Sequence, residues 1–193
     1  FKKDYDNAIS TWKLGLSLFP RSFRLNNYLG DAYKNKDELK IASRYYQRSI
    51  ELSPNFNKSK LSLAFVDIKL GNYEIGWREF EWLSRNWEPA RMFNPIPKTI
   101  RWDGSPLTAG DELLIMPEGG IGDFFQLIRY ALYLKNKSIK ITICSVVKLH
   151  SIISISGLAD KIITPKEVNS YTSGKWIPIF SLPHCLGVRT DNI

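Results

Sequence analysis

Apolar positions in the first half of the chain recur with the period of helices, and their spacing predicts five of them. We expect helices near residues 4–18, 23–35, 38–52, 57–70 and 74–86. Pro20 and Pro54 each lie just beyond one of these segments. We expect them to mark the ends of those helices, because proline cannot continue a helix. The periodicity stops after Trp87, so the helical part is predicted to span residues 1–87.

The same region repeats at an interval of 34 residues. The repeated columns hold a small residue, then an aromatic residue four positions later, then a proline: Ala8, Ala42 and Gly76; Trp12, Tyr46 and Phe80; Pro20 and Pro54. The small residues allow two helices to approach closely, and the aromatic residues are expected to fill space in the core. This pattern resembles the tetratricopeptide family, and the residues that match it best are Gly30, Tyr33, Ala42, Tyr46 and Pro54.

The resemblance implies helical hairpins that stack into an array, with about two and a half repeats in this chain. Such an array binds partners on a concave surface lined by the first helix of each hairpin. The polar residues expected on that surface are Asn26, Asn27, Asp31, Lys60 and Asp67. The alternative is that these residues only solvate their helices, since any exposed helix face has a similar composition.

The second half of the chain begins with a segment rich in proline and glycine, residues 88–111. These residues exclude a regular helix, while the interleaved Trp and Phe argue against a solvated tether. We therefore predict an ordered connector between two domains.

From residue 112 the pattern alternates between strands and helices. Apolar runs predict strands at 112–116, 140–144, 161–164 and 176–180, with helices from about 124 to 135 and over 147–156. Strands separated by helices predict a parallel sheet, so residues 112–193 are expected to form a partial Rossmann-like α/β domain. Pro178 predicts that the last strand is irregular or lies at an edge.

Composition narrows the class of protein. The net charge of +8 is spread along the chain, with 16 Lys and Arg against 11 Asp and Glu in residues 1–91 and 11 against 8 in the rest. We therefore expect no nucleic-acid partner, because nucleic-acid modules concentrate basic residues on one face. No apolar run approaches the ~18 residues of a membrane span. Two distant cysteines and no Cys/His cluster favour the cytoplasm, with no metal and no bound cofactor.

A glycine-rich turn, Gly119-Gly-Ile-Gly-Asp123, follows the first predicted strand and precedes a helix. This arrangement can point backbone N–H groups at an anion. The turn lacks the Gly-Lys-Ser/Thr of a P-loop and the third glycine of the dinucleotide fingerprint, which argues against nucleoside triphosphates and nicotinamide. Asp123 has two interpretations: a cap of the helix, which the spacing alone favours, or a general base for a hydroxyl nucleophile.

Three stretches, Trp77–Trp82, Trp102–Leu107 and Pro117–Tyr130, resemble bacterial tetratricopeptide-repeat glycosyltransferases, and Ser181-Leu-Pro183 is similar to a further motif of that module. In these proteins the repeats precede a GT-B module related to heptosyltransferases. The resemblance implies that Asp123 is the catalytic base, that Gly119, Gly120 and Gly122 shape the substrate-binding loop, and that Gln126 and Arg129 contact acceptor or phosphate.

The family implies a sugar-transfer enzyme with a protein or glycan acceptor. Its nucleotide-sugar donor would bind mainly to a second Rossmann-like domain. Because the sequence stops at Ile193, we expect this chain to be an inactive fragment of such an enzyme. The competing hypothesis is a non-catalytic interaction protein in which a degenerate α/β domain supports the helical repeats.

Overall fold

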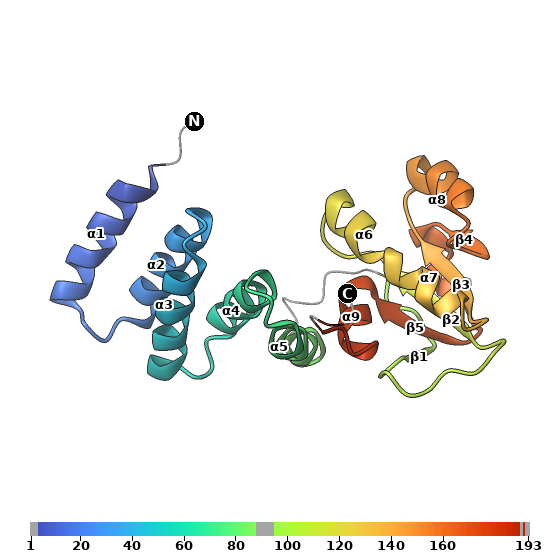
Figure 1. Cartoon of the computed structure of the whole chain (residues 1–193), viewed down its shortest axis with the longest axis horizontal. Coiled ribbons are helices and arrows are strands. Elements are labelled where there is room, and N and C mark those ends of the chain that lie inside the picture. Colours follow the sequence, from blue (N-terminus) through green and yellow to red (C-terminus); the bar gives the residue numbers. More distant parts are fainter. Residues whose placement is uncertain (1–3, 88–94, 190, 192–193) are drawn as a thin grey trace. The chain divides into compact units, whose positions relative to one another are not determined.

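The structure, a computed structural model, describes residues 4–87, 95–189 and 191, and the chain divides into two compact units (Figure 1). The first unit comprises residues 1–88 and 188–193, and the second comprises residues 89–187. Consecutive helices form the first unit, and a parallel sheet with helices forms the second. The predicted fold class, α followed by α/β, is confirmed.

Each helix of the first unit lies within one residue of its predicted bounds. The helices are α1 (Tyr5–Leu18), α2 (Phe23–Asn35), α3 (Leu39–Leu52), α4 (Asn57–Lys69) and α5 (Tyr73–Asn86). Asp4 begins α1 by accepting the N–H of Asn7, and the hydroxyl of Ser22 accepts the N–H of Leu25 at the start of α2. These side chains satisfy N–H groups that have no partner within the helix.

The small residues of the repeat lie where neighbouring helices touch. A Cβ atom on Gly30 would lie 2.6 Å from the ring of Tyr46, which is itself fully buried. At Gly76 a Cβ atom would lie 2.8 Å from the carbonyl oxygen of Ala64 on α4. This contact explains why glycine stands at 76 where the same column elsewhere holds alanine.

The second unit is built on five parallel strands. They are β1 (Ile100–Arg101), β2 (Glu112–Met116), β3 (Lys140–Cys144), β4 (Lys161–Ile163) and β5 (Lys175–Pro178). Their order across the sheet is β1-β5-β2-β3-β4. The observed bounds of β2 and β3 match the prediction residue for residue.

Short helices connect the strands: α6 (Ile121–Leu127), α7 (Arg129–Lys135), α8 (His150–Ser156) and α9 (Leu182–Cys185), with 3₁₀ turns η2 (Val147–Leu149), η3 (Pro165–Ser170) and η4 (Ile179–Ser181). The single helix predicted from 124 to 135 begins earlier, at Ile121, and is interrupted at Ile128. The predicted helix over 147–156 opens with a 3₁₀ turn.

Of the two alternatives predicted from Pro178, the edge position is wrong, because β5 lies inside the sheet between β1 and β2. Strand β1 pairs only with Lys175 and Trp176, so it ends before Pro178 is reached. The missing N–H of this proline therefore falls at the last position of β5, where β1 offers no partner. Phe180, expected in the strand, belongs to the 3₁₀ turn that follows.

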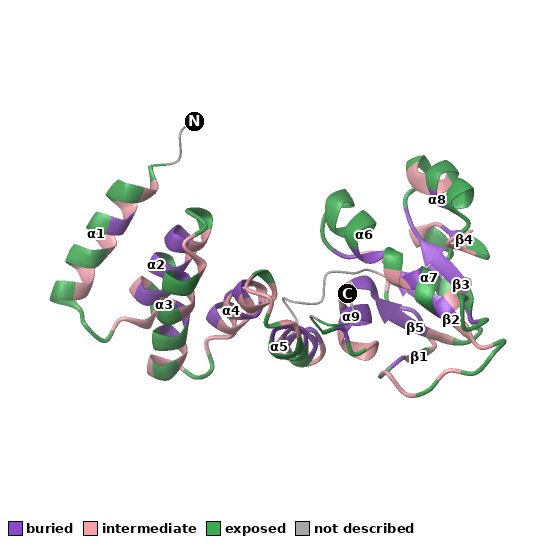
Figure 2. Cartoon of the chain, viewed as in Figure 1, coloured by how far each residue is buried: buried purple, intermediate pink, exposed green. Residues whose placement is uncertain are grey.

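Both faces of the central strands are covered. All four residues from Leu113 to Met116 are buried, as are the last four of β3, and Figure 2 shows the colour of buried residues on the strands of the sheet. On one face, Leu114 and Met116 form a cluster with Val168 of η3 and Tyr171. No helix in the described ranges has the length and apolar character needed to cross a membrane.

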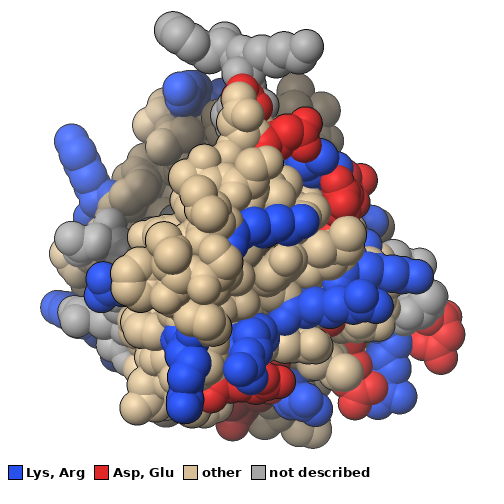
Figure 3. Space-filling model, turned by 90° about the vertical axis from the view of Figure 1, so that its left-hand side faces the viewer, with Lys and Arg blue, Asp and Glu red and all other residues tan. Residues whose placement is uncertain are grey.

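Charged side chains are mixed in sign. Figure 3 shows Lys and Arg on one face of the molecule with Asp and Glu among them. Lys36, for example, forms ion pairs with Asp6 on α1 and with Glu38. Exposed pairs of this kind contribute little to stability, typically ~0–1 kcal/mol.

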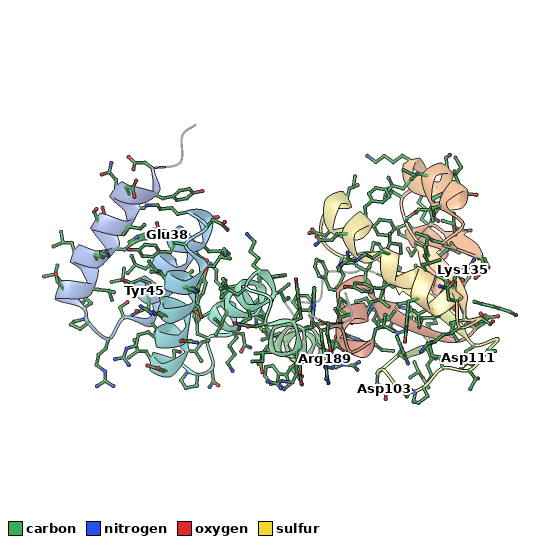
Figure 4. The ribbon with its side chains drawn as sticks, viewed as in Figure 1. Glu38, Tyr45, Asp103, Asp111, Lys135 and Arg189 are labelled. Carbon is green, nitrogen blue, oxygen red and sulfur yellow. The ribbon has the colours of Figure 1, made fainter. Side chains whose placement is uncertain are left out.

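Asp160 ties the start of β3 to the end of α7. Its carboxylate accepts the N–H of Ile141 at 2.7 Å and pairs at 3.0 Å with the ammonium of Lys135, a residue that Figure 4 labels on α7. The N–H of Ile141 holds the pKa of the Asp160 carboxyl below its usual value, and Lys135 acts in the same direction. The folded state therefore favours the ionised carboxylate.

This shift predicts a pH dependence of the second unit. The stabilisation is present above the unfolded pKa of ~3.9 and is lost as the pH falls through the lower folded value. We expect the unfolding free energy of the Asp160→Asn variant to fall less steeply between about pH 4 and pH 2 than that of the unsubstituted protein. Urea titration at several pH values measures this slope. An unchanged slope in the variant would contradict this role of Asp160.

Candidate functional site

The order in which successive strands are added to the sheet reverses direction at β2. The chain passes from β2 to β3 and β4 on one side, and then returns to place β5 on the other side of β2. In open parallel sheets, ligands bind outside the carboxyl ends of the strands at such a reversal. The turns that follow β2 and β5 therefore form the first place to look for a site.

The turn after β2 holds Asp123 against its glycines. The Asp123 carboxylate accepts the N–H of Gly120 at 2.9 Å, which is the interaction of a helix cap. Gly119 has a positive φ of 68°, and a Cβ atom there would lie 2.7 Å from the Asp123 Oδ2 atom. The turn thus needs glycine at 119, and the carboxylate is exposed beside it.

The turn after β5 packs directly on this glycine. A Cβ atom on Gly119 would also lie 2.9 Å from the ring of Phe180. The carboxylate of Glu118, which is 4% exposed, accepts the N–H of Phe180 at 3.2 Å. The residues on either side of the sheet reversal therefore fix the position of the turn that carries Asp123.

A cavity of about 290 Å³ opens at this edge of the sheet. It is lined by Pro117, Glu118, Gly119, Gly120, Ile121, Phe124, Ser145, Val146, Leu149 and Pro165. These residues follow β2, β3 and β4, so the cavity lies at the carboxyl ends of three adjacent strands. Its volume is at the lower end of the ~300–1,000 Å³ typical of ligand pockets, which suits a group of side-chain size.

The structure brings together only part of the predicted substrate-binding set. Gly119 and Gly120 line the cavity, with Asp123 beside them. Gln126 and Arg129 are exposed, and among the described residues neither forms a hydrogen bond or ion pair with Asp123. The Arg129 guanidinium instead lies over the ring of Tyr130 at 5.1 Å. Gly122 has open space where a Cβ atom would be, so no close approach requires glycine there.

Five residues of the cavity lining were not predicted from the sequence as part of a site: Glu118, Ser145, Val146, Leu149 and Pro165. Each of them lies within a few residues of the carboxyl end of a strand. The strand order would have been the signal, because it shows which strand ends are adjacent.

The residues predicted to contact a partner differ in accessibility. Asn26 and Asn27 are 3% and 0% exposed. The amide of Asn26 donates to the carbonyl of Ser22, and Asn27 bonds with Asp31 and Ser59. A partner-binding role for these two asparagines stays a prediction, and their burial does not favour it.

The other three candidates are half-buried. Lys60 places its ammonium 5.4 Å from the ring centre of Trp82, which is 49% exposed. Asp67 accepts a hydrogen bond from the amide of Asn72. Asp31 accepts from Asn27 and, at 2.7 Å, from the hydroxyl of Tyr46. Their role toward a partner likewise stays a prediction.

The bond between Tyr46 and Asp31 belongs to a buried polar network that joins α2, α3 and α4. Burial raises the pKa of the Tyr46 hydroxyl, and its hydrogen bond to Asp31 raises it further, so the group stays protonated. Ser59 bonds with both Asn27 and Ser49 in the same network. Partly satisfied buried networks are costly, so each bond here matters to stability.

We expect Tyr46→Phe to lower the unfolding free energy of the helical unit by about 1–2 kcal/mol, because Asp31 loses a donor while the ring is kept. Thermal unfolding followed by circular dichroism would measure the loss. Tyr45→Phe is the control, since Tyr45 stacks on Tyr33 with ring centres 5.5 Å apart and its ring also remains. Equal effects of the two substitutions would count against the network.

The sequence matches no protein-family model and no curated protein. Among solved structures, the chain is similar to a mutant O-GlcNAc transferase of Thermobaculum terrenum, with a TM-score of 0.42 and 14% sequence identity. The match covers 82% of this chain and 31% of that structure, so the chain spans less than a third of its length.

Proposed function

We propose that this chain is part of a glycosyltransferase and that its α/β unit forms the acceptor side of the active site. One observation carries the proposal: an exposed carboxylate, Asp123, lies on the glycine-rich turn after β2, where the sheet reverses direction, and this turn also borders a cavity at the carboxyl ends of β2, β3 and β4. A general base must reach the proton that it removes. Asp123 bonds to Gly120, which lines the cavity, and in this proposal a hydroxyl of a ligand in the cavity reaches the Asp123 carboxylate.

In this proposal Asp123 removes the proton of the acceptor hydroxyl as the oxygen attacks the anomeric carbon of a nucleotide-activated sugar. The nucleoside diphosphate leaves with the electron pair of the broken bond. The donor binds chiefly to a second α/β domain, as the resemblance of the Gly-Asp turn implies. The helical repeats bind the acceptor or a partner that brings it.

The experiment is a transfer assay with the protein as its gene encodes it. Purified protein is incubated with a panel of radiolabelled nucleoside-diphosphate sugars and a lysate from which small molecules have been removed. Incorporation of label into macromolecules, dependent on the protein, is the expected result. Release of free sugar at the uncatalysed rate with every donor, and no incorporation, would overturn the proposal.

The bond from Gly120 to Asp123 supports a second candidate, a non-catalytic interaction protein. In that case the carboxylate only caps α6, and the α/β unit only stabilises its neighbour. Binding of a partner by a protein that transfers no sugar would favour this candidate.

A further inference from the structure

The lining of the cavity at the carboxyl edge of the sheet has an unusual composition for a sugar site. Six of its ten residues have apolar side chains: Pro117, Ile121, Phe124, Val146, Leu149 and Pro165. Phe124 is 3% exposed, whereas Ile121 and Val146 are 52% and 45% exposed and form part of the rim. The interior is therefore apolar, and the rim is open to a ligand.

Few polar side chains face a ligand inside. The two in the lining, Ser145 and Glu118, are only 2% and 4% exposed. A buried hydroxyl that finds no hydrogen-bond partner destabilises a complex. A sugar ring presents a hydroxyl on most of its carbons, so this cavity disfavours a glycan and favours a hydrocarbon group.

The charges that face the cavity disfavour anions as well. Glu118 forms part of the wall, and Asp123 stands at the adjoining turn. Glu167 on η3 is two residues from the lining residue Pro165, and its carboxylate accepts the N–H of Thr164. Lys148 and Lys166 adjoin lining residues in sequence, but both are exposed and neither lines the cavity. A phosphate or carboxylate placed inside would meet the like charge of these carboxylates.

We infer that this cavity selects the acceptor by holding a bulky uncharged side chain of a peptide, next to the hydroxyl that faces Asp123. The inference rests on the proposed function and names its acceptor class. The Asp123 Oδ2 atom lies 2.7 Å from the Cβ position of Gly119, which lines the cavity. Neighbouring residues of a peptide are ~3.8 Å apart between Cα atoms, so one residue can fill the cavity while the next presents its hydroxyl.

Binding of short peptides to this chain tests the inference without any sugar transfer. The probes are the capped tetrapeptides Gly-Leu-Ser-Gly, Gly-Asp-Ser-Gly and Gly-Leu-Ala-Gly, with maltotriose as the glycan, and nuclear magnetic resonance of the backbone amides reports the contact. We expect both leucine peptides to bind at least about tenfold more tightly than the aspartate peptide and to shift the amides of Ile121 and Val146. Tighter binding of maltotriose, or equal binding of the leucine and aspartate peptides, would overturn the inference.

A matched pair of variants locates the contact. Val146→Ser removes an apolar side chain from the lining, whereas Val147→Ser changes its neighbour, which is 70% exposed and does not line the cavity. We expect Val146→Ser to weaken binding of the leucine peptide about threefold or more, and Val147→Ser to leave it within twofold. Equal effects of the two variants would contradict the assignment, and since both side chains are exposed, loss of folding does not confuse the comparison.

The outcomes separate this inference from the proposed function. If the leucine peptides bind in the cavity but the encoded protein transfers no sugar, the cavity still binds an uncharged peptide side chain, and the glycosyltransferase proposal fails. If sugar is transferred equally well to leucine and aspartate peptides, the proposed function stands and the inference fails.

Discussion

Replacing Asp123 with asparagine is expected to lower the rate of sugar transfer about 10²–10⁴-fold, the usual contribution of a general base. Asparagine cannot accept the proton of the acceptor hydroxyl. Its side-chain oxygen can still accept the N–H of Gly120, which Asp123 now accepts at 2.9 Å. Asp123 is the third residue of α6, so asparagine keeps this bond to the N-cap residue Gly120 but loses the charge, and the stability of the α/β unit should fall by no more than about 1 kcal/mol. The measurement is kcat for transfer, together with the urea midpoint of the variant.

Asp103→Asn is the matched control for this experiment. Asp103 is also exposed, and its carboxylate likewise accepts a local backbone N–H, that of Ser105 at 3.0 Å. It lies in the segment between β1 and β2, away from the cavity lining. We expect this variant to keep its transfer rate. If Asp123→Asn also keeps its rate while Asp123→Ala loses stability, Asp123 is a cap and not a base.

The largest expected loss of stability follows from Gly174→Ala. Gly174 has a φ of +66°, and a Cβ atom there would lie 2.2 Å from the carbonyl oxygen of Glu112. That oxygen belongs to the backbone at the start of β2, whose next residue, Leu113, is in register with Lys175. Relief of the clash therefore requires β2 and β5 to separate. We expect a loss of about 3–5 kcal/mol in the unfolding free energy of the α/β unit, measured by urea titration.

Gly157→Ala separates the clash from the backbone conformation. Gly157 has the same φ of +66°, but no atom lies within 4 Å of the position of its Cβ atom. Its substitution should cost only about 1–2 kcal/mol, the ordinary penalty of a left-handed residue. Similar losses for the two alanine variants would show that the contact with Glu112 is not the cause.

The sequence predicts well those elements whose pattern is local. The bounds of β2 and β3 follow from apolar runs that are buried on both faces, and the helices of the repeats follow from their period. Strand β1 has only two residues and therefore no period of its own. It exists because Ile100 and Arg101 pair with β5, more than seventy residues later in the chain.

The candidate site was predictable only on one of its sides. The Gly-Asp turn that carries Asp123 is a contiguous motif, so it was visible in the sequence. The opposite wall comes from Ser145, Val146 and Pro165, which follow two other strands. Nothing in the residues themselves marks them as neighbours of the turn at Gly119 and Gly120, since that proximity depends on strand order. The position of β5 inside the sheet was missed for the same reason.

The position of β5 has a consequence for synthesis of the chain. When β2, β3 and β4 have left the ribosome, one edge of β2 remains without its neighbour until residues 175–178 follow, some sixty residues after β2. During that interval an apolar strand exposes unpaired N–H and C=O groups, which is the condition for pairing with another chain. The helical repeats need only local contacts and can fold as they emerge. The nascent protein should thus be most prone to aggregate in the interval between synthesis of β2 and synthesis of β5, just before β5 closes the sheet.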